Sequence, residues 1–364
     1  MLLTLIVFIL VFSVVVIAHE FGHFMVAKLN GIKVLEFAVG MGPTILKFTK
    51  GETKYVLKLL PLGGACMFEG EDGVYSEEQN KDKDTQEIKN NAEDKPEGAF
   101  NDANVWARIA TVFAGPFFNI ILAFLLSLIV VGFSGVVTPT INGITEGYPA
   151  MEAGLQAGDI ITEMNGENIY LQGEVSLVSA LNKGEPIEIE YKRNGEVYKT
   201  TIVPKFSEED NRYYIGFTIG EHYECKGFDL IKYSAYEVRY WLNATVKSLI
   251  MLVQGQLTAN DLSGPVGIAV TIDETIEQAK PYGVPTIVLT MINFAVLLSV
   301  NLGVMNLLPI PALDGGRLLF LFIEVLRGKP IPPEKEGVVH FIGFVALMIL
   351  TVFVLYNDLT RIFS

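Results

Sequence analysis

Four long apolar stretches constrain this chain more than any other feature, because a helix needs about 20 apolar residues to cross a bilayer. They cover residues 2–27, 109–137, 284–326 and 338–356. Half of the 364 residues are hydrophobic, and the mean hydropathy of +0.39 is high for a soluble protein. We therefore expect an α-helical membrane protein with about four transmembrane helices.

The apolar stretches also divide the chain into segments with different expected roles. Pro309 and Pro311 interrupt the third stretch, and the segment before it contains enough polar sequence for a soluble module. The expected transmembrane helices lie within 1–30, 105–137, 284–326 and 338–360, and the segments between them are 31–104, 138–205 and 206–283.

Basic residues beside the apolar stretches predict how the chain is oriented. Most of them lie in the 28–108 loop and the 327–337 loop, so both loops should face the cytoplasm. The termini and residues 138–283 should then lie outside. A cleaved signal peptide is the alternative for the first stretch, but no Lys or Arg precedes it, as a signal peptide would require.

Charge and cysteine content exclude several functions. The net charge of −14 argues against nucleic acid as a partner, because phosphate binding needs a basic surface. The two cysteines, Cys66 and Cys225, are far apart and are predicted on opposite sides of the membrane. They therefore indicate neither a disulfide framework nor a cysteine zinc site.

The clearest chemical motif lies at the end of the first apolar stretch. Residues 19–23 read His-Glu-Phe-Gly-His, which fits H-E-x-x-H. On a helix, His19 and His23 share one face, so both imidazoles can bind one metal ion. Glu20 can then act as general base on a water at that metal. Two histidines packed at a helix end are the alternative, but ionisable groups in a membrane span are usually functional.

A catalytic zinc site usually has three protein ligands, so a third must come from elsewhere. Asp314 is the best candidate, since it lies toward the cytoplasmic end of the third apolar stretch, at a depth similar to the histidines. His222 and His340 are less well placed. The alternative role for Asp314 is an ion pair with Arg317, one helical turn away.

Further motifs follow the order found in a known family. Together they resemble the site-2 family of intramembrane zinc metalloproteases, in its bacterial regulator-of-sigma-E (RseP-like) branch. The resemblance implies a membrane-associated β-hairpin near residues 40–64 and substrate binding by Asn301 and Asn306. The motifs are HEFGH at 19–23, GMGP at 40–43, PLGG at 61–64, AGPFFN at 114–119, SGPVG at 263–267 and the N-x-x-P-x-P-x-L-D-G pattern within 301–316.

Residues 138–205 are similar to one PDZ domain of the protease-associated kind. The signature is the run from Gly147 to Ile161, GYPAMEAGLQAGDII, followed by Asn165-Gly166. Asn165-Gly166 and Asn194-Gly195 are strong hairpin turn signals. This α+β domain should lie outside the membrane. It could bind a substrate's tail by adding a strand, or it could exclude substrates that still carry a folded ectodomain.

Two segments remain less defined. Residues 226–262 contain Tyr233, Tyr236, Tyr240 and Trp241, which suit either a helix at the membrane interface or packing against the PDZ domain. Residues 71–98 are rich in charged and amide side chains and are predicted to be a mobile loop.

The resemblance implies hydrolysis of transmembrane segments by regulated intramembrane proteolysis. A zinc ion would polarise the scissile carbonyl and activate a water, while Glu20 would take the water's proton and pass it to the leaving amine. The break at Pro309 and Pro311 leaves backbone near Asn306 free to hold an extended substrate. Expected partners are the lipid bilayer of the bacterial inner membrane and single-span proteins already cut by a site-1 protease, such as anti-sigma factors or remnant signal peptides.

Three other classes of protein fit less well. One is a zinc enzyme of another kind, such as a lipid hydrolase, but the expected strands beside the site favour a peptide substrate. A transporter would need inverted repeats, and the two halves of this chain are not similar. A membrane scaffold without activity would be expected to lack Glu20 or one of the metal ligands, and all of them are present.

Overall fold

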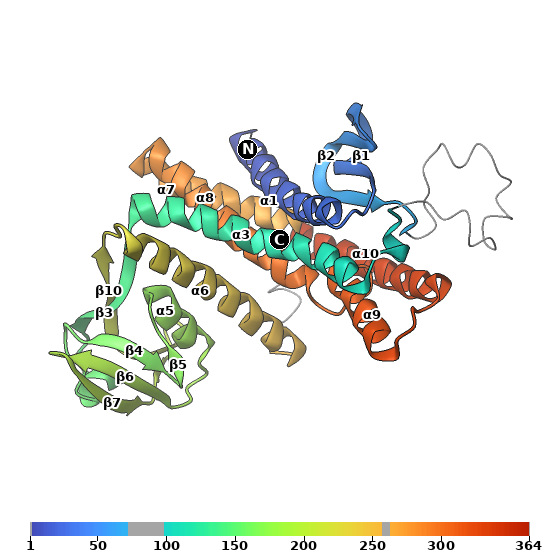
Figure 1. Ribbon diagram of the computed structural model, residues 1–364. Coiled ribbons are helices and arrows are strands. Elements are labelled where there is room, and N and C mark those ends of the chain that lie inside the picture. Colours follow the sequence, from blue (N-terminus) through green and yellow to red (C-terminus); the bar gives the residue numbers. More distant parts are fainter. Residues whose placement is uncertain (1, 72–97, 257–262, 364) are drawn as a thin grey trace, which may run out of the picture. The chain divides into compact units, whose positions relative to one another are not determined.

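The computed structural model describes residues 2–71, 98–256 and 263–363 (Figure 1). Nearly all of the predicted mobile loop at 71–98 lies outside the described residues. The chain divides into two compact units. One comprises residues 1–123 and 245–364, and the other comprises residues 124–244.

Four helices in the described part of the chain are long and apolar enough to cross a membrane, which confirms the predicted number. Each contains a long, predominantly apolar stretch, and a helix satisfies its own backbone hydrogen bonds, as a membrane-spanning segment must. The four helices are α1 (Leu2–Leu29), α3 (Val105–Ser134), α8 (Val284–Asn306) and α10 (Pro333–Phe363).

The third predicted segment, 284–326, is two helices rather than one interrupted span. α8 ends at Asn306, and α9 (Asp314–Arg327) begins after a loop that contains Pro309 and Pro311. Proline lacks the backbone N–H that a helix interior needs, so two prolines within three residues stop the helix. Only the first part, through Asn306, has the length and hydropathy of a span.

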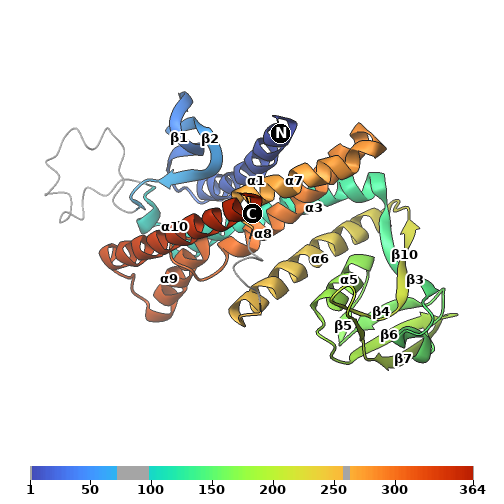
Figure 2. The ribbon, with the colours of Figure 1, turned by 180° about the vertical axis from the view of Figure 1, so that it is seen from behind.

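The segment 206–283 contains a further helix that the sequence did not predict, α7 (Pro265–Ala279). The SGPVG motif forms its start, where Asp358 of α10 accepts hydrogen bonds from the backbone N–H groups of Gly264 (3.1 Å) and Gly267 (2.8 Å). Figure 2 shows α7 and α8 beside α1. Short 3₁₀ turns, η2 (Phe100–Asp102) and η4 (Lys280–Tyr282), precede α3 and α8.

The predicted β-hairpin is formed by two long antiparallel strands, β1 (Val34–Lys50) and β2 (Thr53–Phe68). Its base packs on α1, where the rings of Phe24, Phe37 and Tyr55 are in mutual contact. The strand pairing contains several register shifts, and the hairpin forms a two-stranded sheet of its own (Figure 1).

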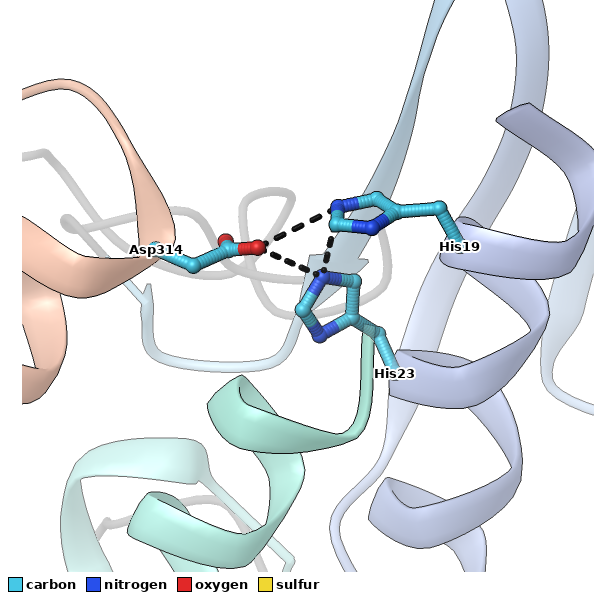
Figure 3. A group of neighbouring side chains, drawn as sticks. All are labelled: His19, His23 and Asp314. Atoms are coloured by element: carbon cyan, nitrogen blue, oxygen red, sulfur yellow. Dashed lines mark hydrogen bonds and ion pairs between the residues drawn. The ribbon is translucent and has the colours of Figure 1, made fainter. Parts of the chain in front are cut away.

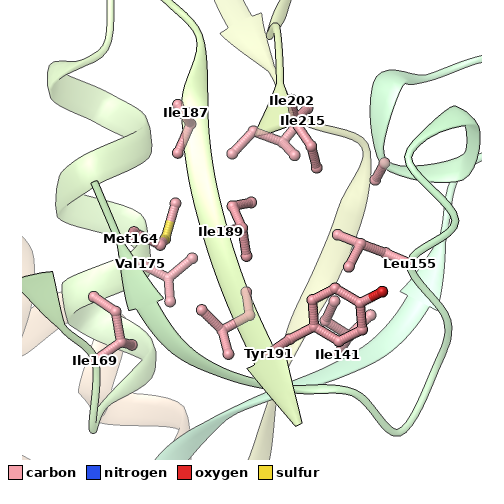
Figure 4. Close-up of a cluster of buried hydrophobic side chains, with 12 residues drawn as sticks. Ile141, Leu155, Met164, Ile169, Val175, Ile187, Ile189, Tyr191, Ile202 and Ile215 are labelled. Carbon is pink, nitrogen blue, oxygen red and sulfur yellow. The ribbon is translucent and has the colours of Figure 1, made fainter. Parts of the chain in front are cut away.

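The second unit contains a PDZ-type domain. Its core is a cluster of buried aliphatic side chains, with Tyr191 at one end, between the sheet and helix α5 (Figure 4). One antiparallel sheet has the order β10-β3-β4-β6-β7, with β5 beside β4 and a separate β8–β9 pair. The elements are β3 (Val136–Ile144), α4 (Pro149–Glu152), β4 (Ile160–Met164), β5 (Glu167–Asn168), α5 (Gln172–Leu181), β6 (Ile187–Arg193), β7 (Glu196–Ile202), β8 (Lys205–Ser207), β9 (Arg212–Tyr214) and β10 (Phe217–Tyr223).

The two Asn-Gly turn signals are confirmed. Asn165 and Gly166 have φ values of 50° and 79°, and Asn194 and Gly195 have 53° and 88°, as a two-residue hairpin turn requires. The sheet continues past the predicted boundary at 205, because β10 pairs with β3 as far as Tyr223. Pairing between strands so far apart in sequence leaves no local signal.

Helix α6 (Phe228–Val253) follows the domain. The ring of Tyr236 stacks on Tyr170 at 3.9 Å between centroids. Arg239 donates hydrogen bonds to Glu174 (2.7 Å) and to the carbonyl of Asn168 (2.9 Å). Of the two alternatives for the tyrosines of this helix, the structure therefore shows packing against the PDZ-type domain.

Candidate metal centre

Two histidines from one helix form the base of the candidate site. His19 and His23 lie one turn apart on α1, and both side chains are buried. Their Nε2 atoms are 3.3 Å apart, and their rings meet edge to face. The i, i+4 spacing thus brings both imidazoles to one point, as the motif predicts.

Asp314 reaches the same point from the first residue of α9 (Figure 3). Its Oδ2 lies 3.2 Å from Nε2 of His19 and 3.4 Å from Nε2 of His23. The alternative ion pair with Arg317 is not formed, because that guanidinium pairs with Glu71 and lies over the ring of Phe100. The three predicted ligand atoms are therefore together.

The geometry of these atoms fits a zinc ion. Zinc binds imidazole nitrogen and carboxylate oxygen at about 2.0–2.2 Å, so two ligand atoms of a tetrahedral site should be about 3.4 Å apart. The observed separations among the three atoms are 3.2, 3.3 and 3.4 Å. Three such donors leave one position for a water or a substrate oxygen, which is the arrangement of catalytic rather than structural zinc sites.

Helix α3 provides the space for the two imidazoles. A Cβ atom on Gly115 would lie 2.2 Å from Nε2 of His23 and 2.8 Å from Cε1 of His19. Gly22 makes the same kind of close approach from α1, since a Cβ there would lie 2.4 Å from the carbonyl oxygen of Ala114. Both glycines are required for the helices to pack this closely beside the candidate metal ligands.

The outer nitrogens of the histidines also have partners on α3. Nδ1 of His23 lies 2.9 Å from the carbonyl oxygen of Thr111, to which it donates, so Nε2 keeps its lone pair for a metal. Nδ1 of His19 lies 3.3 Å from the side-chain amide of Asn119. The atom of Asn119 that faces this nitrogen is Nδ2. A metal on Nε2 would leave a proton on Nδ1 of His19, which Asn119 would accept through its amide oxygen once the amide is flipped.

Glu20 lies between the hairpin and the histidines. Its side chain is buried and passes over Gly64 of β2, where a Cβ atom would lie 2.5 Å from Cγ of Glu20. The PLGG motif therefore provides the room that the carboxylate occupies.

The predicted substrate residues lie near the centre but differ in position. Nδ2 of Asn306 lies 3.2 Å from Nε2 of His19, at the last residue of α8. The side chain of Asn301 is instead hydrogen-bonded to Thr245 of α6. Pro309 and Pro311 belong to the loop between α8 and α9, and Pro311 lines an apolar cavity of about 380 Å³ against α10.

Comparison with known proteins identifies the family. Residues 7–350 match the model of peptidase family M50. The chain belongs to this family. This M50 peptidase is 34% identical to zinc metalloprotease RasP of Shouchella clausii, covering 99% of this chain and all of the relative. It is also 34% identical to the regulator of sigma-W protease RasP of Bacillus subtilis, with 99% of both chains covered.

Solved PDZ domains are similar to part of this M50 peptidase. The PDZ domain of an SdrC-like protein from Listeria monocytogenes is 25% identical, with 23% of this chain and 86% of that chain covered and a TM-score of 0.21. The family, its zinc metalloprotease members and the four apolar helices make this chain an integral membrane zinc metalloprotease.

The sequence did not point to several residues around the centre. Gly115, Thr111 and Asn119 lie in or near the AGPFFN motif, which was recognised only by resemblance. Their roles depend on contacts between α1 and α3, and neither spacing nor composition encodes such contacts.

Proposed function

We propose that this M50 peptidase hydrolyses peptide bonds of transmembrane segments with a zinc ion held by His19, His23 and Asp314. The observation that carries the proposal is the set of three separations of 3.2, 3.3 and 3.4 Å among their ligand atoms. Two neutral imidazoles and one carboxylate leave a net positive charge with zinc, which suits an electrophilic centre.

Glu20 is the proposed general base. When bound, zinc polarises the scissile carbonyl and makes a water at the site more acidic. Glu20 takes a proton from the attacking water and delivers it to the leaving amine nitrogen. Asn306, whose amide lies beside His19, donates a hydrogen bond to the substrate backbone and holds the scissile bond in place.

The substrate must be extended at the site, because a helix hides its peptide bonds in its own hydrogen bonds. Two features support binding of an extended segment. The hairpin doubles back on itself, so that residues 36–39 of β1 pair with residues 64–67 on one side and with residues 54–57 on the other. Its outermost segments, 64–68 and 44–50, offer the edges to which a strand can be added. The loop after Asn306 presents backbone that is outside any helix, next to the metal ligands.

The substrates are single-span membrane proteins. One relative is named a regulator of sigma-W protease, which favours membrane-bound regulators such as anti-sigma factors; remnant signal peptides have the same single-span form. We place the protein in the bacterial cytoplasmic membrane, with the metal centre toward the cytoplasm and the PDZ-type domain outside. That domain would exclude substrates until a first protease has shortened them.

The test compares wild type with Glu20→Gln in detergent, measuring bound zinc and cleavage of a single-span model substrate. Glu224→Gln is the matched control, because its carboxylate is exposed and pairs only with Lys226 among the described contacts. We expect about one zinc per chain in all three proteins and cleavage by wild type and Glu224→Gln only. Cleavage by Glu20→Gln would refute the general-base role, and wild type without zinc would refute the metal site.

A further inference from the structure

The loop that delivers Asp314 adopts an unfavourable backbone conformation. It consists of residues 307–313, between α8 and α9. Ala312, two residues before Asp314, has a φ of +76°, in the left-handed region that residues with a Cβ atom rarely adopt. Such conformations persist only where surrounding contacts hold them in place.

The backbone N–H groups of this loop can be fully accounted for. Pro309 and Pro311 have none. The N–H groups of Leu307, Leu308, Ile310 and Leu313 donate to carbonyls at most three residues earlier in the chain. The N–H of Ala312 alone goes to another element, where it donates to Nδ1 of His340 on α10 at 2.9 Å. Ala312 is exposed, so the bond does not relieve a buried unpaired N–H; it favours the observed loop conformation by the modest free energy of one hydrogen bond to α10.

Helix α10 supports the loop over more than this one contact. One turn further along, a Cβ atom on Gly343 would lie 2.4 Å from Cβ and 2.5 Å from the carbonyl oxygen of Pro311. The ring of His340 also lies 5.5 Å from that of Phe320 on α9. The imidazole thus contacts both the loop and the helix that Asp314 begins.

The protonation of His340 follows from these contacts. Nδ1 accepts a hydrogen bond, so in the neutral ring Nε2 carries the proton. The carboxylate of Glu336, one turn earlier on α10, lies 3.8 Å from Nε2 and favours that tautomer. The imidazole therefore accepts a hydrogen bond from the loop through Nδ1, while the carboxylate of Glu336 lies near Nε2 at more than hydrogen-bond distance.

We propose that His340 is a positioning residue for the metal centre: by holding the N–H of Ala312, it sets where the carboxylate of Asp314 lies relative to His19 and His23. The proposal rests on the ligand role of Asp314. A zinc site tolerates changes of about 0.2 Å in ligand distance, so a change of backbone conformation at Ala312 would displace Asp314 from the metal. His340 itself need not touch metal or substrate.

The test uses full-length protein in detergent with three substitutions at one position. Asn places its side-chain oxygen where Nδ1 of His340 lies, one bond from Cγ. Gln places its oxygen one bond further, and Leu has no acceptor. Zinc affinity is measured by competition with a chelator, and kcat and KM are measured on a single-span substrate. Asp314→Asn is measured in parallel.

For His340→Leu and His340→Gln we expect zinc Kd to rise about 10- to 100-fold, as for other residues that orient metal ligands, with kcat reduced and KM within about threefold of wild type. His340→Asn should stay within about threefold of wild type in both zinc Kd and kcat. Rescue by Asn but not Gln distinguishes a hydrogen-bond acceptor from a ring that only fills space.

Each other outcome contradicts a particular step. Wild-type zinc affinity in both His340→Leu and His340→Gln, with Asp314→Asn impaired, would overturn the role of His340 alone. Equal loss in His340→Asn and His340→Gln would also overturn it, even if His340→Leu did not fold. Wild-type zinc affinity in Asp314→Asn would instead refute the ligand assignment on which the proposal rests.

Discussion

Replacing Gly115 with alanine is the most direct test of how the metal centre is built. The added Cβ atom would lie 2.2 Å from Nε2 of His23, 2.5 Å from its Cε1 and 2.8 Å from Cε1 of His19. Non-bonded atoms of this kind normally stay about 3.5 Å apart or more. At least one imidazole would therefore have to move by more than about 1 Å, well beyond the roughly 0.2 Å that metal coordination tolerates.

The surroundings leave little room for such a movement. His23 is held by the carbonyl of Thr111 on α3. Moving α1 away from α3 would open the close packing of Gly22 against the backbone of Ala114. Inserting a methyl group into a closely packed site typically costs about 1–3 kcal/mol. If the methyl group destabilises the zinc-bound protein by this amount relative to the zinc-free protein, the Kd for zinc should rise about 5- to 150-fold.

The assay is chelator competition for zinc, followed by cleavage of a single-span substrate. Gly132→Ala is the matched control, because it lies on the same helix and its Cβ atom would meet nothing closer than 3.6 Å. Alanine is also the better helix former, so neither substitution should weaken α3 itself. Gly115→Ala should lose both zinc affinity and cleavage, whereas Gly132→Ala should keep both.

Wild-type zinc affinity in Gly115→Ala would refute this reasoning. It would mean that the imidazoles do not lie where the close contact requires them. Equal loss in both variants would point to a general effect of added volume in α3 rather than to a specific contact at the metal centre.

Two further predictions follow from other parts of the structure. Burial, and then the charge of Glu174, raise the pKa of Glu237 on α6 from 4.5 to about 7. The folded state therefore binds the extra proton, so stability should fall as pH rises from about 4.5 to about 7, by at most about 3 kcal/mol. Glu237→Gln should flatten this trend in the pH dependence of the denaturation midpoint; an unchanged slope would contradict the assignment. Secondly, a single-span substrate with Gly or Asn near the scissile bond should be cut faster than an all-Leu one, because it unwinds more easily; equal rates would refute the need for an extended substrate.

The membrane character of this protein and the juxtaposition of His19 and His23 could be predicted from the sequence. Long apolar runs leave few alternatives to spanning helices, since backbone polar groups in lipid must be paired within the segment. The spacing of His19 and His23 fixes their relative placement, because a helix repeats every 3.6 residues. The two Asn-Gly turns could also be predicted from local sequence, because asparagine and glycine adopt positive φ more readily than other residues.

Features that depend on distant partners were not predicted. The sheet of the PDZ-type domain continues to Tyr223 because β10 pairs with β3, about 80 residues earlier in the chain. The start of α7 is capped by Asp358, which lies at the far end of α10. Neither partner is visible in the local sequence.

The assembly of the complete centre was decided by the tertiary structure. Asp314 could be proposed as a ligand from its position in the chain, but its approach to 3.2 Å from His19 depends on a loop that ends one helix and starts another. The space for both imidazoles depends on Gly115, and the conformation of the loop is supported by His340 on α10. Helical periodicity relates residues only a few positions apart, so it can be recognised in the sequence. Contacts between helices depend instead on how side chains from distant segments pack together.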